Sequence, residues 1–99
     1  MIDIDEKREE LRAFLKTPGM YTIGDDFEAV SAYVCGFDHA LGQVILSGFT
    51  TWLTAKYEVN SPQGWQGYIL GICLDKNMTE SAQQVEFLIA NVSEFLEAP

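Results

Sequence analysis

The sequence predicts an all-α fold, a compact single-domain bundle of about five helices that spans residues 1–99. Apolar residues recur at spacings of three and four in successive segments, and helix-capping sequences precede most of these segments. Hydrophobic residues make up 47% of the chain and aromatic residues 12%, far more than a disordered acidic segment contains. A chain of 99 residues can bury one core, so we expect one domain without internal linkers.

The first helix is expected over about residues 4–16. Asp3 and Glu6 have the spacing of a capping box, in which each side chain satisfies a free backbone amide. An apolar stripe follows at Leu11, Phe14 and Leu15. A Pro-Gly pair comes soon afterwards, and proline disfavours helical geometry in the residue before it, so the helix should end there.

The second helix has the clearest pattern in the chain. Asp25 and Glu28 repeat the capping-box spacing at its start, and Gly42 is placed to cap its end. The expected apolar stripe consists of Phe27, Val30, Val34, Phe37 and Leu41. Residues 43–49 contain a short apolar run, for which we expect a loop or helical turn because no second alternating run exists to pair with it.

The third and fourth helices are shorter. Thr50 or Thr51 is expected to cap the third, which runs through Lys56. Ser61 and Pro62 predict the start of the fourth, with serine as the cap and proline as the first helical residue. The expected buried face of the fourth helix consists of Trp65, Tyr68, Ile69, Ile72 and Cys73.

The last helix is expected to start near Thr79 or Ser81, where Ser81 and Gln84 form another capping-box pattern. Its long apolar stripe consists of Val85, Leu88, Ile89, Val92, Phe95 and Leu96. A stripe of this length indicates that one whole face of the helix is buried.

The charge of the chain restricts its partners. Lysine and arginine total 6 against 15 aspartates and glutamates, so the formal net charge is 6 − 15 = −9. Residues 17–55 contain no lysine or arginine at all. Such a chain repels nucleic acid and anionic membranes, and we expect a protein partner with a basic surface. Acidity that serves only to maintain solubility is the alternative.

The location expected from the sequence is the cytoplasm. The first residues are acidic and contain no apolar core of the kind found in secretory signals, and no apolar run is long enough to span a bilayer. Cys35 and Cys73 each lie within an apolar helical pattern, which is typical of free thiols in a reducing compartment.

No residue pattern predicts an enzyme, a metal site or a cofactor. Cys35 and His39 are four residues apart, which would place them on one helix face, but a mid-helix thiol without an orienting residue is a weak nucleophile. One histidine and two distant cysteines do not form a zinc-binding pattern. The acidic cluster at residues 25–28 lacks the spacing of a calcium loop, and helix capping explains it.

Several short motifs occur together in one order. An acidic first helix precedes Pro-Gly-Met-Tyr at Pro18–Tyr21, Phe-Glu-Ala at Phe27–Ala29 and Gly-Phe-Asp at Gly36–Asp38. A Trp-Leu and Lys-Tyr stretch at Trp52–Tyr57 and a Ser to Gly-Trp segment at Ser61–Trp65 follow. In these features the chain resembles immunity proteins of bacterial contact-dependent growth inhibition systems. The resemblance implies a cytosolic protein that binds and blocks a toxin domain, often a nuclease.

An acidic surface that occludes a basic cleft is the expected binding mode. The candidate charged residues are Asp25, Asp26, Glu28 and Asp38, with Glu58 at the rim. Asp38, within a helix, should be the cleanest surface probe. Trp52 and Tyr57 are candidate aromatic anchors, although each is explained equally well as a core residue. The alternative function is a non-enzymatic adaptor or regulatory domain that acts through helix packing and exposes an apolar helical stripe.

Overall fold

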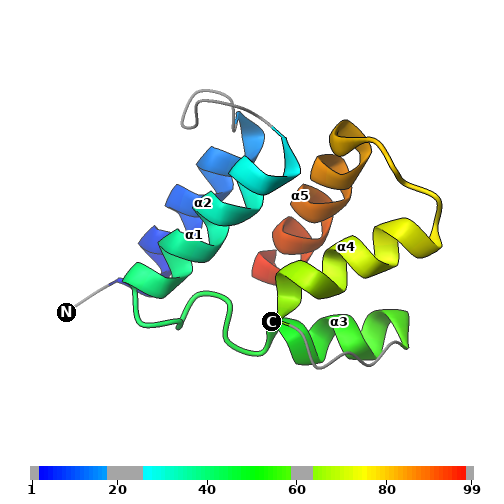
Figure 1. Cartoon of the computed structure of the whole chain (residues 1–99). Coiled ribbons are helices and arrows are strands. Elements are labelled where there is room, and N and C mark those ends of the chain that lie inside the picture. Colours follow the sequence, from blue (N-terminus) through cyan, green and yellow to red (C-terminus); the bar gives the residue numbers. More distant parts are fainter. Residues whose placement is uncertain (1–2, 18–25, 59–63, 98–99) are drawn as a thin grey trace.

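The computed structural model describes residues 3–17, 26–58 and 64–97 of the 99-residue chain. Figure 1 shows the helices of the described residues, which are α1 (Ile4–Lys16), α2 (Phe27–Ala40), α3 (Phe49–Tyr57), α4 (Trp65–Asp75) and α5 (Ser81–Glu97). The described residues form no strand, and the predicted all-α class is therefore confirmed.

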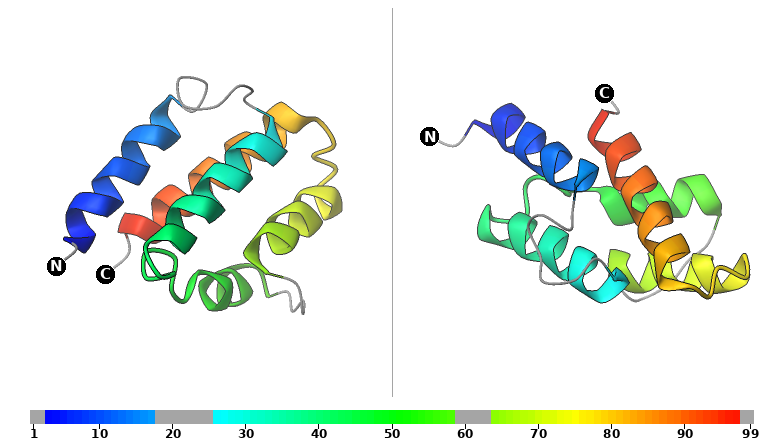
Figure 2. Two further views of the ribbon diagram at one scale, coloured as in Figure 1. Left: turned by 60° about the vertical axis from the view of Figure 1, so that its left-hand side comes forward. Right: turned by 90° about the horizontal axis from the view of Figure 1, so that it is seen from above.

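Helix α5 is the centre of the bundle. It contacts α1, α2 and α4, whereas α3 packs mainly on α4. Figures 1 and 2 show α1 and α2 on one side of α5, and α3 and α4 on the other. Among the described residues, no helix combines the length and the apolar content that crossing a membrane requires.

The core combines apolar residues from all these helices. The fully buried side chains with the largest volumes include Phe14 of α1, Phe49 of α3, Tyr68 of α4 and Leu88 of α5. The turns between α2 and α3 contribute Ile45 and Leu46, which are also buried. The apolar run that the sequence left undecided is therefore a turn segment that inserts its side chains into the core.

The first two helices begin with aspartate caps. The Asp3 carboxylate accepts a hydrogen bond from the Glu6 amide at 3.2 Å, as the capping pattern predicts. At α2 the cap is Asp26, whose carboxylate accepts from the Ala29 amide at 2.8 Å. The expectation of a cap at Asp25 is wrong, and Asp25 itself lies outside the described residues. Gly42, with φ +76°, adopts the left-handed conformation expected after α2.

The predicted starts of α3 and α4 are displaced. Gly48 occupies the cap position of α3 with φ +84°, instead of Thr50 or Thr51, because the preceding turns lead directly into the helix through this left-handed residue. Helix α4 begins after Gly64, later than the Ser61 start that the sequence predicted; Ser61 and Pro62 lie outside the described residues.

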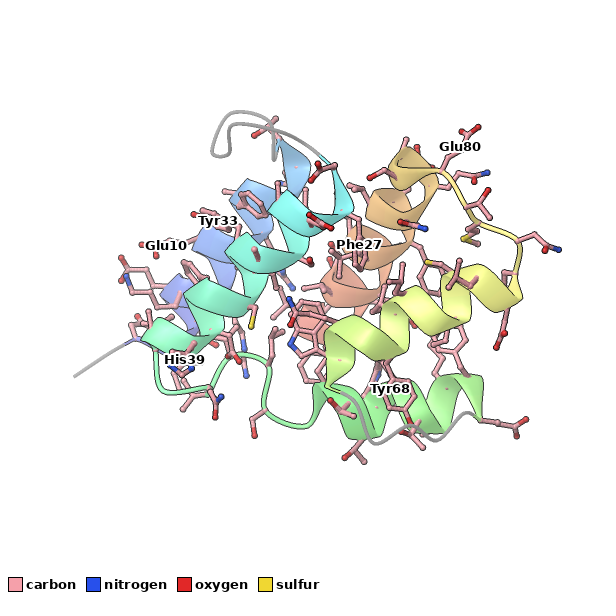
Figure 3. All side chains as sticks on the ribbon, in the orientation of Figure 1. Glu10, Phe27, Tyr33, His39, Tyr68 and Glu80 are labelled. Carbon is pink, nitrogen blue, oxygen red and sulfur yellow. The ribbon has the colours of Figure 1, made fainter. Side chains whose placement is uncertain are left out.

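The capping box of α5 lies one residue earlier than predicted. The Gln83 side chain accepts from the Glu80 amide at 3.4 Å. The two predicted box residues have other partners instead: Ser81 Oγ accepts from the Phe27 amide of α2 at 2.8 Å, and buried Gln84 donates to the Met78 carbonyl in the preceding turn at 3.1 Å. The Ser81 bond joins the starts of α2 and α5. In Figure 3, Phe27 lies between these helices, whereas Glu80 points outward.

Phe37 is less central than its place in the apolar stripe suggests. It is half-buried and stacks on Tyr33 with ring centroids 6.3 Å apart, while Phe27, Val30 and Val34 are buried in the core. The face of α2 that meets α5 is thus centred on the first half of the helix.

Candidate functional site: an acidic pocket at one end of the bundle

The negative charge of the protein lies outside α1. Helix α1 holds four acids and four cations and is neutral, 4 − 4 = 0. From residue 17 onward there are ten acids and two cations, a balance of −8, and Asp3 supplies the remaining unit of −9. A basic partner is therefore attracted to α2–α5 and their connections, and not to α1.

The fold accounts for most of the acids. Ion pairs hold Asp5 and Glu10 to cations of α1, Glu9 and Glu97 to Arg12, and Glu94 to Lys56. Other acids stabilise helix starts, where the dipole favours negative charge, as at the caps and first turns of α1 and α2. Each of these carboxylates has a structural role that needs no binding partner.

Glu58, Asp75 and Glu86 are different, because they neither lie at a helix start nor form an ion pair with any residue that the structure describes. Glu58 is the C-cap of α3 and Asp75 is the last residue of α4. The C-terminal end of a helix carries partial negative charge and favours a cation, so an acid there opposes the dipole. These two carboxylates lower the stability of the helix ends on which they lie.

Side-chain contacts place the chain neighbours of the three acids at one end of the molecule. The Tyr57 ring lies 5.6 Å from the Phe87 ring, and Lys76 Nζ lies 6.0 Å from the Tyr57 ring. Each of these residues is the chain neighbour of one of the three acids. Figure 1 shows the ends of α3 and α4 on the same side of the bundle. We call the surface formed by Glu58, Asp75 and Glu86 the acidic end.

A pocket of about 300 Å³ opens at the acidic end, lined by Met78, Gln83, Glu86 and Phe87. Met78 and Phe87 are half-buried and provide an apolar surface, whereas Gln83 and Glu86 are exposed. Asn77, at φ +63°, ends α4 in a Schellman motif in which the Met78 amide donates to the Cys73 carbonyl at 2.8 Å. This turn fixes the backbone that carries Met78.

A cation beside the acidic end is already neutralised. Lys56 Nζ pairs with Glu94, lies 3.4 Å from Asn91 Oδ1 and is 4.9 Å from the centroid of the Trp52 ring. Burial alone would lower the pKa of Lys56, but the hydrogen bond to Glu94 and the charges of Tyr57 and Glu94 outweigh it, and the pKa is raised. Lys56 therefore links α3 to α5.

Asn91 connects Tyr57 to the same cluster. Asn91 is 2% exposed, its Oδ1 accepts from the Tyr57 hydroxyl at 2.7 Å, and its Nδ2 donates to the Phe87 carbonyl at 2.9 Å. Both the ring and the hydroxyl of Tyr57 are thus held in place, next to Glu58 of the acidic end.

A second, larger hollow lies on another part of the surface. This groove has a volume of about 460 Å³ and is lined by Arg8, Val44, Ile45, Ser47, Trp52, Phe95 and Leu96. Trp52 is half-buried there, stacked on Phe49 at 5.8 Å and edge-on to Phe95 at 5.7 Å. Trp52 therefore serves the core with one part of its ring and lines the groove with another.

The predicted binding residues do not form one site. Asp26 and Glu28 are exposed at the start of α2, Tyr57 and Glu58 belong to the acidic end, and Trp52 lines the groove. Asp25 lies outside the described residues.

The structure contradicts the prediction that Asp38 is an exposed binding residue. It is only 8% exposed, and its Oδ1 accepts from the Leu46 amide at 2.8 Å. The expectation that Asp38 presents its charge to a partner, and is a clean surface probe, is wrong because its carboxylate holds the turn after α2.

Sequence reasoning missed Asp75, Glu86 and Phe87. Asp75 could have been found as an acid that directly follows the last apolar residues of a helix, where a cation is the norm. Glu86 and Phe87 gave no such signal, because they become part of a site only when α3 and the end of α4 pack beside α5.

The residues weighed for chemistry lie apart from the acidic end. Cys35 is a half-buried free thiol and His39 projects from the exposed end of α2, and the two side chains share no hydrogen bond in the described part of the chain (Figure 3). Burial raises the pKa of the Cys73 thiol and keeps it protonated. Within residues 3–17, 26–58 and 64–97, no group of three or more metal-binding side chains occurs.

Comparison of the chain with protein-family models, with curated proteins and with solved structures found no match.

Proposed function

We propose that this chain is an immunity protein that binds a cognate toxin domain of the nuclease class and blocks its basic active-site cleft without catalysis. The observation that carries the proposal is the acidic end, where Glu86 lines an open pocket and none of Glu58, Asp75 and Glu86 forms an ion pair with a residue that the structure describes. The predicted resemblance to growth-inhibition immunity proteins supports the same conclusion, and the proposed place of action is the cytoplasm.

The stability cost of the acidic end supports a role in binding. An acid against the helix dipole typically costs about 0.3–1 kcal/mol at an exposed site. Glu58 adds a second cost, because it holds φ +55°, a left-handed conformation that disfavours residues with a Cβ. Departures from local rules of stability tend to occur where function requires them.

The charge of the acidic end complements a nuclease cleft. Such a cleft presents lysine and arginine side chains to phosphate groups. Carboxylates on the ends of packed helices can replace those phosphates, while the remaining acids of α2 to α5 accelerate encounter by electrostatic steering. Blocking the cleft in this way requires no catalytic residue on the inhibitor.

The test is protection of a cell from the toxin. The candidate toxin is to be sought as a basic domain encoded by a neighbouring reading frame, and its expression should arrest growth unless this protein is made in the same cell. Reversal of Glu58, Asp75 and Glu86 to lysine should abolish protection, whereas the same number of reversals in α1, at Glu6, Glu9 and Glu10, should not. Full protection by the first variant, with both variants folded by circular dichroism, would refute the proposal.

An adaptor function is the second candidate, and the Trp52 groove favours it. Val44 is 41% exposed beside this groove, and the aromatic rings of Trp52 and Phe95 offer a surface suited to an apolar segment. If the adaptor function holds, Val44→Asp will abolish partner binding and the lysine reversals at the acidic end will not.

A further inference from the structure

We infer that the pocket at the acidic end receives one arginine side chain of the basic partner. This inference rests on the proposed function and deepens it, because it names the chemical group that the site recognises. Its basis is the combination of an apolar, aromatic surface with an unneutralised carboxylate in a pocket of about 300 Å³. That volume is at the lower limit of ligand pockets, which suits a single side chain.

The apolar part of the pocket suits the stem and the plane of arginine. Phe87 is half-buried and is supported by the Tyr57 ring, whose plane is inclined to it by 47°. Met78 contributes a polarizable thioether on a backbone fixed by the Schellman turn. The methylene stem of arginine packs on such surfaces, and its planar guanidinium stacks on aromatic rings.

The charged part of the pocket suits a cation. Glu86 is exposed, lines the pocket and forms no ion pair with the described residues. Glu58 and Asp75 add negative charge nearby, and the C-terminal ends of α3 and α4 add that of their dipoles. A carboxylate accepts two parallel hydrogen bonds from a guanidinium, a geometry that lysine cannot provide.

Lys76 places one cation of the protein itself at the acidic end. Its Nζ lies 6.0 Å from the Tyr57 ring, at the outer limit of a cation–π contact, and forms no ion pair with the described residues. Since Lys76 repels an incoming guanidinium, loss of its charge should strengthen arginine binding.

The experiment uses the full chain and three small probes of matched size, N-acetyl-arginine amide, N-acetyl-lysine amide and N-acetyl-citrulline amide. Citrulline keeps the shape of arginine without its charge. Titration is followed by nuclear magnetic resonance, on the Met78 methyl group and the Phe87 ring. Arginine should shift both signals with an affinity at least about threefold above that of lysine, and citrulline should shift neither. Equal binding of arginine and citrulline, or of arginine and lysine, would overturn the inference.

Single substitutions test which residues of the acidic end determine arginine binding. Glu86→Gln should weaken arginine binding at least about threefold, and Lys76→Met should strengthen it about twofold. Glu10→Gln is the matched control, because it makes the same change of net charge on α1 and should have no effect. Equal weakening by Glu86→Gln and Glu10→Gln would show that only net charge matters, which contradicts the inference.

The inference and the proposed function can fail separately. If the protein protects cells and Glu86→Gln protects equally well, with arginine failing to shift Met78 or Phe87, the pocket inference is wrong and the immunity function stands. If arginine binds as described and no protection is seen, the immunity function is wrong and the arginine site stands.

Discussion

At the scale of single residues, Asp38 shows how an acid of a negatively charged protein can belong entirely to the fold. Its carboxylate accepts from the Leu46 amide, and its backbone carbonyl accepts from the amides of Leu41 and Gln43 at 3.1 and 2.8 Å. One residue therefore ends α2 and positions the turn that inserts Leu46 into the core. The sequence could not show this, because the bonded amide lies eight residues away in an irregular segment.

Asp38→Ala should destabilise the protein by about 1–3 kcal/mol, because it leaves the buried Leu46 amide without a partner. Asp38→Asn retains an acceptor oxygen and should cost less. Urea denaturation measures both, with Glu28→Ala as the exposed control on the same helix. An Asp38→Ala midpoint equal to that of the control would disprove the role of Asp38 in the turn.

At the scale of elements, helix existence was predictable and helix ends were only partly so. The apolar stripes are local patterns, and the helices formed as predicted. The predicted cap at Ser81 failed because a tertiary partner took the side chain, whose Oγ accepts from the Phe27 amide of a distant helix. The acidic end could not be predicted for the same reason, since the pocket that Glu86 lines forms only when α3 and the end of α4 pack beside α5.

The end of α3 should gain stability from glycine. Glu58→Gly removes both the left-handed strain and the acid that opposes the dipole, so we expect a gain of about 0.5–1 kcal/mol. Glu58→Ala removes the charge but keeps a Cβ at φ +55°, and should gain less. Thermal unfolding compares them, and a lower midpoint for Glu58→Gly than for Glu58→Ala would contradict this account. If the acidic end binds a toxin as proposed, the glycine variant should also bind it more weakly, since Glu58 is part of the acidic end.

The pairing of Lys56 on α3 with Glu94 on α5 should make the folded protein lose stability at alkaline pH. The pKa of Lys56 is raised above 10.5, so the folded protein retains this proton more strongly than the unfolded chain. Its contribution to stability is complete below pH 10.5 and decreases as the pH rises through the higher folded-state value. Lys56→Met should therefore be less stable at neutral pH and lose less stability on alkaline titration.

Glu94→Gln provides the check on that link, because it removes the hydrogen-bonded carboxylate that raises the pKa of Lys56. Its stability, measured by urea denaturation across the alkaline range, should also fall less steeply than that of the unmodified protein. Parallel curves of stability against pH for the unmodified protein, Lys56→Met and Glu94→Gln would show that Lys56 does not cause the loss of stability at alkaline pH.

At the scale of the whole molecule, charge is distributed unequally. Helix α1 is neutral, and the excess of acids lies on the remainder of the chain. Rates of association with a basic partner depend on the potential of the face that approaches it, and salt screens this potential over a Debye length of about 8–10 Å.

Glu86→Lys and Glu10→Lys make the same change of net charge on different parts of the molecule. If the acidic end faces the toxin, the first should slow association strongly and the second only slightly, and added salt should reduce the difference. Stopped-flow kinetics at low and high salt measure this. Equal rates for the two variants would mean that the excess of acids maintains solubility alone.

The central position of α5 has a consequence for biosynthesis. This helix is made after the other four, yet α1, α2 and α4 all pack against it. While residues 81–97 remain inside the ribosome, the emerging chain has no surface on which to bury those apolar faces. A chain that stops before residue 81 therefore lacks these contacts and should be cut readily by protease. Under the proposed function, protection would therefore require chains in which α5 is complete.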